Sequence, residues 1–167
     1  MNIKAKFVLF PMMSILLMAA YASAQMDMAH GGNVADRKLT TIPPLPTCAR
    51  GNVVSGDPSQ GNTIIFASIA TGCTIPWHWH TPTERVMIAS GVARIDVKDH
   101  KSMTLHSGGF AMLPSKHIHQ FHCNSSCQIF VYSDLPFDLH YVNAKGDEIT
   151  PADANKAVKQ KAATEMK

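Results

Sequence analysis

From about residue 53 onward, short apolar runs alternate with clusters of turn-forming residues, without a helical spacing of apolar residues between them. The runs are rich in Val, Ile, Phe and Tyr, which favour strands, whereas the clusters are rich in Gly, Ser, Asp, Asn and Pro, which favour turns. The runs are "TIIFASIA" (63–70), "ERVMIAS" (84–90), "VARIDV" (92–97), "FAML" (110–113), "HIHQFH" (117–122), "CQIFVYS" (127–133) and "LHYV" (139–142). Many short strands with frequent turns predict an all-β fold, an antiparallel sandwich or barrel.

A helix is expected only near the end of the sequence, in residues 150–167. Thr150 can cap it, Pro151 suits its first turn, and Asp153 suits the positive end of a helix dipole. Val158 is its only large aliphatic residue, so that the apolar face is thin. We therefore expect a short surface helix that frays.

The first 24 residues have the pattern of a secretory signal peptide. Lys4 and Lys6 precede an almost wholly apolar run at 7–20, and Ala22-Ser23-Ala24 offers small residues for cleavage. An uncleaved anchor is the alternative, but the run is short for a bilayer that needs about 20 residues. We expect cleavage after Ala24, export to the periplasm or the medium, and no stable membrane insertion afterwards.

The remaining 143 residues suit one domain with a hydrophobic core. We expect a flexible arm at 25–46, a barrel at 47–145 and a helical tail at 146–167. Removing two lysines lowers the formal charge from +3 to +1, which argues against nucleic acid or an anionic membrane as a partner. In the arm, Met26, Met28 and His30 have side chains that bind copper, but a loose processed terminus is the favoured interpretation.

Four cysteines in an exported chain make disulfides plausible, and four cysteines allow three pairings. Cys123 and Cys127 flank "NSS", which reads as a tight turn between two strands, so we favour a bridge across that hairpin. Cys48 would then pair with Cys73. Four buried thiols are the alternative, because strand geometry can forbid so short a bridge.

Two histidines and a glutamate converge in the stretch "GCTIPWHWHTPTERVMIASG" (72–91). His78 and His80 are two residues apart, which places them on one face of an extended segment. Glu84 begins the next strand and shares its face with apolar residues, so its carboxylate should point into the interior. A buried charge needs a partner, and a cation held between imidazoles would supply one.

A second histidine pair follows about 35 residues later. In "SGGFAMLPSKHIHQFH" (107–122), His117 and His119 again share a face, and an antiparallel barrel can place this strand beside the first. Packing or hydrogen-bonding histidines in a metal-free barrel are the alternative. Four convergent groups favour a metal site.

These residues resemble the first motif of the cupin superfamily. Gly72, His78, His80, Glu84 and Gly91 match its spacing in full, as glycine, five residues, histidine, one residue, histidine, three residues, glutamate, six residues, glycine.

The second cupin motif is matched with departures. Gly108, Pro114 and His119 have the expected spacing, but Lys116 stands where cupins usually carry glycine, and Cys123 where they carry asparagine. Residues 46–143 resemble a small exported single-domain cupin. The resemblance implies a double-stranded β-helix, or jelly-roll barrel, and pairing of two copies into a homodimer.

The resemblance also implies the metal ligands, which are His78, His80, Glu84 and His119. Three neutral imidazoles and a carboxylate suit one divalent transition metal per chain, Fe, Mn, Ni, Cu or Zn, without choosing among them. This ligand set leaves one or two positions for water or a small molecule.

The other candidate residues have weaker assignments. His117 is a rim base, an alternative ligand or a surface residue. His140 can reach the pocket rim, but an interfacial or surface role is favoured. The remaining expectations are that His122 points outward, that His100 and His106 are solvated, that Trp77 and Trp79 face away from the metal, and that Phe110, Met112, Phe121, Ile129 and Val131 belong to the core.

The leading functional hypothesis is a periplasmic metalloenzyme, an oxygenase that acts on a small oxygenated organic molecule. Glu84 would be a labile fourth ligand and a catalytic base. Isomerisation or decarboxylation by Lewis acidity is also open. A non-catalytic cupin that binds or senses a metal or metabolite is the second hypothesis, and a structural subunit with a blocked barrel mouth is the third.

Overall fold

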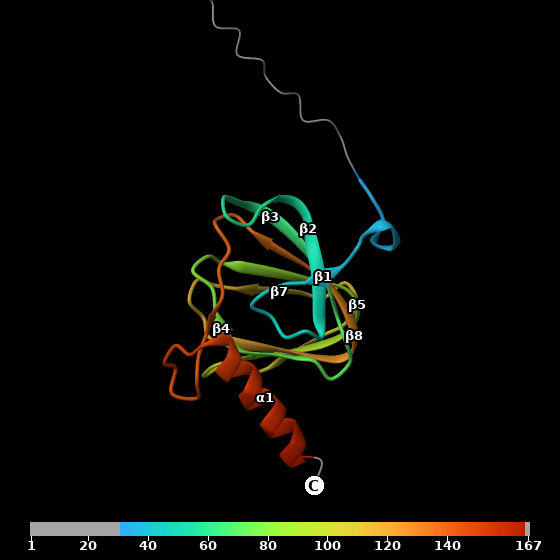
Figure 1. Cartoon of the computed structure of the whole chain (residues 1–167). Coiled ribbons are helices and arrows are strands. Elements are labelled where there is room, and N and C mark those ends of the chain that lie inside the picture. Colours follow the sequence, from blue (N-terminus) through green and yellow to red (C-terminus); the bar gives the residue numbers. More distant parts are fainter. Residues whose placement is uncertain (1–30, 166–167) are drawn as a thin grey trace, which may run out of the picture. The chain divides into compact units, whose positions relative to one another are not determined.

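A computed structural model describes residues 31–165, and residues 33–165 of this range lie in one compact unit. Its elements are η1 (Val34–Asp36), β1 (Thr40–Thr41), β2 (Ala49–Asp57), β3 (Gly61–Ile69), β4 (Thr74–Trp79), β5 (Glu84–Val97), β6 (Met103–Leu105), β7 (Phe110–Leu113), β8 (His119–Ser133), β9 (His140–Tyr141) and α1 (Pro151–Glu165). The strands curl into an antiparallel barrel (Figure 1), which confirms the predicted all-β jelly-roll class. The predicted signal peptide at 1–24 and the possible copper ligands Met26, Met28 and His30 lie outside the described residues.

Two long bent strands, β5 and β8, join the two sides of the barrel. The first part of β5 pairs with the last part of β8, and the last part of β5 pairs with the first part of β8. On their other edges, β8 pairs with β3 and β4, whereas β5 pairs with β6 and β7. Residues far apart in the sequence therefore line one common interior.

The prediction of separate strands at 84–90 and 92–97 is wrong, because Gly91 bends β5 without ending it. Gly91 has φ +88°, and a Cβ there would lie 2.4 Å from the carbonyl oxygen of Ser125. The register between β5 and β8 shifts on both sides of this point. A glycine bulge accommodates the bend, so the strand continues.

The predicted tight turn at 124–126 is also wrong. Residues 119–133 form the single strand β8, and Ser125 pairs with Val92 across the bulged region. The two predicted disulfides nevertheless form. Cys123 pairs with Cys127 within β8, and Cys48 pairs with Cys73, the residues just before β2 and β4. The pairing is right although the hairpin that suggested it is absent.

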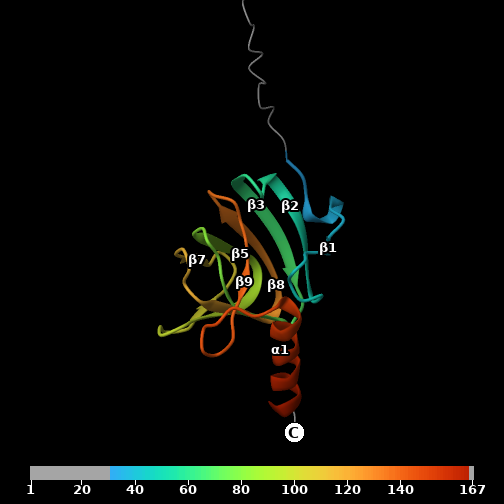
Figure 2. The same cartoon turned by 60° about the vertical axis from the view of Figure 1, so that its left-hand side comes forward.

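The segment expected as a flexible arm contributes to the sheet. Thr40 and Thr41 of β1 pair with Gly51 and Arg50 of β2, and β1 lies along β2 at the edge of the barrel (Figure 2). The described part of the arm therefore has a fixed place beside the barrel wall.

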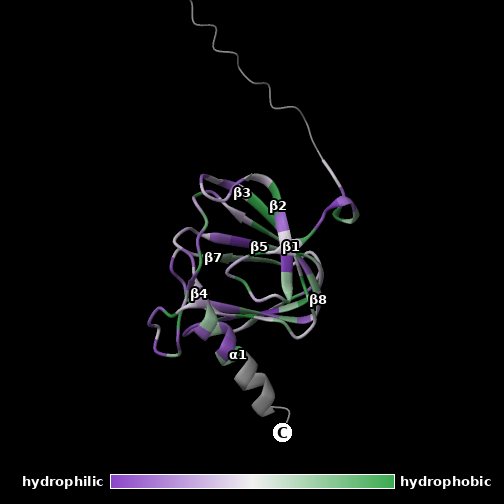
Figure 3. Cartoon of the chain, viewed as in Figure 1, coloured by the Kyte–Doolittle hydropathy of each residue, from purple (hydrophilic) through white to green (hydrophobic). Residues whose placement is uncertain are grey.

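The hydrophobic core lies between the curled strands. Figure 3 shows hydrophobic stretches along the strands and hydrophilic residues at the start of α1. Of the predicted core residues, Phe121, Ile129 and Val131 are buried, whereas Phe110 and Met112 are exposed by 54% and 56%. The prediction for these two was wrong because they alternate outward along β7, in which Ala111 and Leu113 face the interior.

The C-terminal helix begins as predicted. The backbone N–H of Asp153 donates to Thr150 Oγ1 at 3.2 Å, and the Thr150 hydroxyl donates to the Asp153 carboxylate at 2.7 Å. Ala154 is buried in the core cluster, so the first turn of α1 is packed while the helix extends from the end of the barrel (Figures 1 and 2). Within residues 31–165, no helix is long and apolar enough to cross a membrane.

Candidate metal centre

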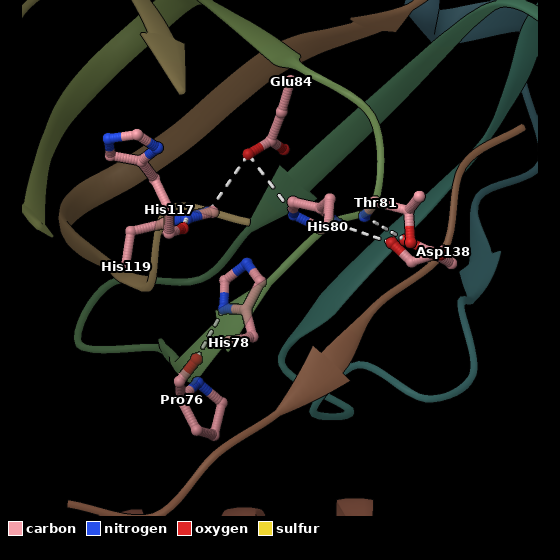
Figure 4. A network of polar contacts seen from close by, with 8 residues as sticks. All are labelled: Pro76, His78, His80, Thr81, Glu84, His117, His119 and Asp138. Atoms are coloured by element: carbon pink, nitrogen blue, oxygen red, sulfur yellow. Dashed lines mark hydrogen bonds and ion pairs between the residues drawn. The ribbon is translucent and has the colours of Figure 1, made fainter. Parts of the chain in front are cut away.

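The first two histidines lie at the end of β4, where its pairing becomes irregular. Pro76 cannot donate a ladder hydrogen bond, and the register between β4 and β8 shifts between Ile75 and His78. His78 and His80 are each only 3% exposed. Both rings point inward, with their centroids 4.9 Å apart, as their two-residue spacing predicts (Figure 4).

Glu84 and His119 begin the two long strands and complete the group. Glu84 is 7% exposed and shares the inner face of β5 with Val86 and Ile88, which are also buried. His119 pairs in register with His78, and the centroids of these two rings are 4.2 Å apart. One ligand atom from each of the four predicted residues lies within 4.8 Å of the others.

A backbone carbonyl oxygen lies next to Nδ1 of each of the three histidines. Because a carbonyl only accepts hydrogen bonds, each Nδ1 carries the proton, and the lone pair of each neutral ring is on Nε2. The acceptors are Pro76 for His78 (2.6 Å), Asp138 for His80 (2.5 Å) and His117 for His119 (2.8 Å) (Figure 4). Metal-binding histidines are held in this way in proteins.

The bare nitrogens face the Glu84 carboxylate. Its Oε2 is 3.2 Å from Nε2 of His119 and 3.4 Å from Nε2 of His80. Nε2 of His80 is buried without a hydrogen bond of good geometry in the described structure. Lone pairs and a carboxylate directed at one point repel each other unless a cation lies between them.

The surroundings shift the pKa values of three of these groups. Burial lowers the pKa of His78 well below its usual value, and neighbouring His119 and His80 lower it further. Burial also lowers the pKa of His80, but the Glu84 carboxylate and Asp138 together outweigh this effect, so that the net shift is upward. Burial raises the pKa of Glu84, yet the neighbouring imidazoles of His80 and His119 bring it well below the usual range, so the buried carboxylate is ionised.

The donor set fits a divalent transition metal. Three imidazole nitrogens without protons and one ionised carboxylate are ligands that Fe, Mn, Ni, Cu and Zn accept. The buried Nε2 of His80 is the orphaned polar atom that such an ion would satisfy. The group can therefore hold a metal ion, although its chemistry does not select one.

Phe137 and Asp138 support His80 in the structure, and neither of them was predicted from the sequence. The ring of Phe137 stacks on His80 with centroids 4.4 Å apart and an interplanar angle of 21°. The Asp138 carbonyl accepts from His80, and its carboxylate accepts from the backbone N–H of Thr81 at 2.7 Å. The dipeptide lies one residue before β9, but only the pairing of β9 with β4 brings it to the site.

The four site residues line a cavity of about 570 Å³ inside the barrel. This volume lies in the usual range for small-molecule sites. Most of the other lining side chains are apolar, among them Ile65, Ile69, Val86, Leu113, Phe121 and Val131. A cavity of this size argues against the hypothesis of a purely structural subunit with a blocked barrel.

The other predicted residues lie outside the group. His117 is exposed and contributes only its backbone carbonyl to the site, while His100 and His106 are exposed as expected. His122 is half-buried and its Nδ1 is 2.6 Å from the Thr74 hydroxyl, so it is not simply directed into solvent. His140 stacks on Trp79 at 3.9 Å, which confirms that this tryptophan packs against a neighbouring strand and not on the metal site.

Residues 65–132 match the family model described as Cupin domain. No curated protein sequence matches the chain. Three similar solved structures are a proposed acetylacetone dioxygenase from Methylibium petroleiphilum PM1 (13% identity, 74% of this chain and 87% of that chain, TM-score 0.58), the DMSP lyase DddQ from Ruegeria pomeroyi DSS-3 (18%, 60% and 55%, 0.52) and KdgF from Halomonas sp. (13%, 61% and 92%, 0.50). At these identities the likeness concerns the fold alone.

Proposed function

Since the chain belongs to the cupin superfamily, we propose that it is an exported metal-dependent enzyme of the oxygenase type that acts on a small oxygenated organic molecule. His78, His80 and His119 would hold one divalent transition metal, with Glu84 as the fourth ligand. The observation that carries the proposal is the fixed tautomer of the three histidines, whose bare Nε2 atoms converge with an ionised carboxylate in a cavity.

A bound divalent ion would supply a Lewis-acid centre with open positions for an oxygen-containing ligand. The protein contributes orientation, because the three carbonyl acceptors fix the rings. The apolar lining of the cavity excludes water from the ligand. Glu84 would serve as the base that takes a proton from the bound molecule, since its carboxylate is ionised and its ion-pair partners in the described structure are the imidazoles of His80 and His119.

Oxygenase chemistry is our preference within a fold that supports several reactions. Structures with this fold include a proposed acetylacetone dioxygenase and a DMSP lyase. Fold alone does not separate these reactions. Glu84 and Asp138 are the only carboxylates among the described lining residues, and the Asp138 carboxylate already accepts from Thr81. This lining favours a reaction in which a bound metal ion supplies most of the catalysis.

The first experiment measures metal content and oxygen consumption. Protein purified from the periplasm is analysed for its elements, and the Fe- and Mn-loaded forms are tested with a panel of diketones and phenols. We expect one metal ion per chain and oxygen uptake with at least one class. Glu84→Gln should lose turnover while the protein remains folded, and a variant that keeps both its metal and full turnover contradicts the role of Glu84.

A non-catalytic cupin that binds a metal or metabolite is the alternative function. The apolar cavity suits storage or sensing as well as catalysis. Saturable binding of a panel compound without oxygen uptake or product would favour this alternative. Native mass spectrometry of the purified protein would also reveal a ligand retained from the cell.

Export and pairing are parts of the same proposal. The two disulfides suit an oxidising compartment, and cleavage after Ala24 would leave Gln25 as the first residue. Mass spectrometry of the N-terminal peptide from periplasmic protein tests this. We also propose a homodimer, which the apolar outer face of the sheet supports.

A further inference from the structure

We propose that residues 42–45, here called the strap, form a specificity-determining wall of the cavity and limit its ligands to a metal-binding oxygen head with a short apolar body. This inference rests on the proposed metal site and adds the class of ligand. Ile42, Pro43, Pro44 and Leu45 line the same cavity as the three histidines and Glu84. A segment outside the core strands of the barrel thus closes part of the space next to the site.

The cavity lining defines the kind of ligand body that can enter. Apart from the four site residues, the polar residues along it are Thr40, Thr41, Asn52 and Asp138. Asp138 and Thr40 already have partners, since the Asp138 carboxylate accepts from Thr81 and the Thr40 hydroxyl lies 3.5 Å from the Gly51 carbonyl. The side-chain oxygen of Asn52 is buried without a hydrogen-bond partner and can accept one from a ligand. A ligand with many hydroxyl groups would still lose most of its bonds to water without replacement, so a largely apolar body is favoured.

The Tyr141 hydroxyl, on the strand β9 that pairs with the histidine strand β4, holds the strap. Tyr141 is 2% exposed, pairs in register with His78, and donates its O–H to the carbonyl oxygen of Pro44 at 3.2 Å. Burial raises the pKa of Tyr141 to about 12, so the phenol keeps the proton that it donates. The strap is thereby fixed relative to the histidine strand.

The strap also packs closely against β2 because residue 51 has no side chain. A Cβ at Gly51 would lie 2.8 Å from Cδ1 of Ile42 and 2.1 Å from the Phe66 carbonyl oxygen. On either side, β1 pairs with β2, and Ala49 N–H donates to the Pro46 carbonyl at 2.9 Å. These contacts make the strap a fixed wall, so its side chains set the length of the space beyond the metal.

The test measures how ligand affinity depends on tail length. Zinc-loaded protein is titrated by calorimetry with straight-chain alkyl hydroxamates, whose head binds metal, and metal-free protein is titrated with 1-alkanols of the same tails. Affinity should rise about fourfold for each added methylene until the tail meets the strap, and then stop rising. Ile42→Ala and Leu45→Ala should move this limit to longer tails in both series.

Leu135→Ala is the control, because Leu135 is 60% exposed and does not line the cavity. Its length limit should equal that of the wild type. Unchanged zinc affinity in the strap variants shows that their site is folded. Identical limits in the wild type and both strap variants overturn the inference. If zinc does not bind but the strap variants still shift the tail-length limit for alkanols, the proposed metal function is wrong and the role of the strap as a cavity wall is supported.

Discussion

At the scale of single residues, the position of one proton on each imidazole decides what the site can bind. Three carbonyl oxygens place those protons on Nδ1, away from the cavity, and the ionised Glu84 adds a fourth acceptor. No donor among these four groups faces the others while the rings are neutral. The site is therefore suited to binding a cation.

Replacing His119 by alanine should abolish tight metal binding, whereas replacing His117 should not. His119 supplies an inward Nε2, while His117 contributes its backbone carbonyl, which alanine retains. We expect at least a 100-fold loss of zinc affinity for His119→Ala, since disturbing even outer partners of metal ligands costs about 10–100-fold. Competition with a chelating dye measures both variants. Equal losses in the two variants would assign the site to another set of ligands.

Asp96 should make the free energy of unfolding depend on pH in the acidic range. Its carboxylate accepts from Arg94 Nε and Nη2 at 2.8 and 2.7 Å and from Gln120 Nε2 at 2.7 Å. The hydrogen bond from Arg94 is the main cause that holds the pKa of Asp96 far below its usual range, against a smaller effect of burial. Because the folded pKa is lowered, this stabilisation is present above about pH 4 and is lost as the pH falls below it.

Asp96→Asn should therefore lower the free energy of unfolding by about 2 kcal/mol at pH 7 and by less at pH 3. Urea denaturation at both values measures the difference. Asp99→Asn is the matched control, because Asp99 is exposed in the next turn and its φ of +61° is tolerated by asparagine. A constant cost of Asp96→Asn at both pH values contradicts the assignment.

At the scale of elements, the Cys48–Cys73 bridge ties the start of β2 to the strand that carries His78. The bridge joins residues 25 apart in sequence, which corresponds to about 3.5 kcal/mol of loop-closure stabilisation. We expect Cys48→Ala with Cys73→Ala to lose about this much in denaturant unfolding. In this double variant, a reductant should remove only the smaller contribution of Cys123–Cys127, about 2 kcal/mol. A double variant as stable as the wild type would contradict this account.

The elements also show what local patterns can and cannot predict. The short strand at 110–113 and the capped helix start at Thr150 follow from local signals, and the structure has both. Gly91 and "NSS" at 124–126 are equally good local turn signals, but here they bend β5 and β8 within a paired ladder. Whether such a signal turns or only bends a strand depends on the distant strand beside it, which a local pattern does not contain.

The same limit applies to the candidate site. The ligand residues could be predicted, because their spacing within two short stretches places them on inner faces. Phe137, Asp138 and the strap could not, since they reach the site only through the pairing of β9 with β4 and β1 with β2. The outward direction of Phe110 was missed for a related reason, as apolar composition alone does not say which side of a strand is covered.

At the scale of the whole molecule, the outer face of the sheet carries an apolar row that supports pairing of two copies. Phe110, Met87 and Phe130 lie side by side in register on β7, β5 and β8, and Phe110 and Met87 are exposed by 54% and 37%. In the next row Arg85 is neutralised by Asp134 at 2.9 Å. Such an uncharged surface can meet its own copy across a two-fold axis without repulsion, and β7 pairs only with β5 in the described sheet.

Light scattering coupled to size exclusion should give twice the chain mass for the wild type and the single chain mass for Phe110→Lys combined with Met87→Lys. Two lysines in register would bring four like charges together in a symmetric interface, where their desolvation is unfavourable. Leu135→Lys adds a charge at another exposed apolar residue and should remain dimeric. Zinc affinity should be the same in all three proteins, because the altered side chains point away from the cavity. A wild-type protein that stays at the single chain mass at every concentration tested would show that the apolar row has some other use than self-association.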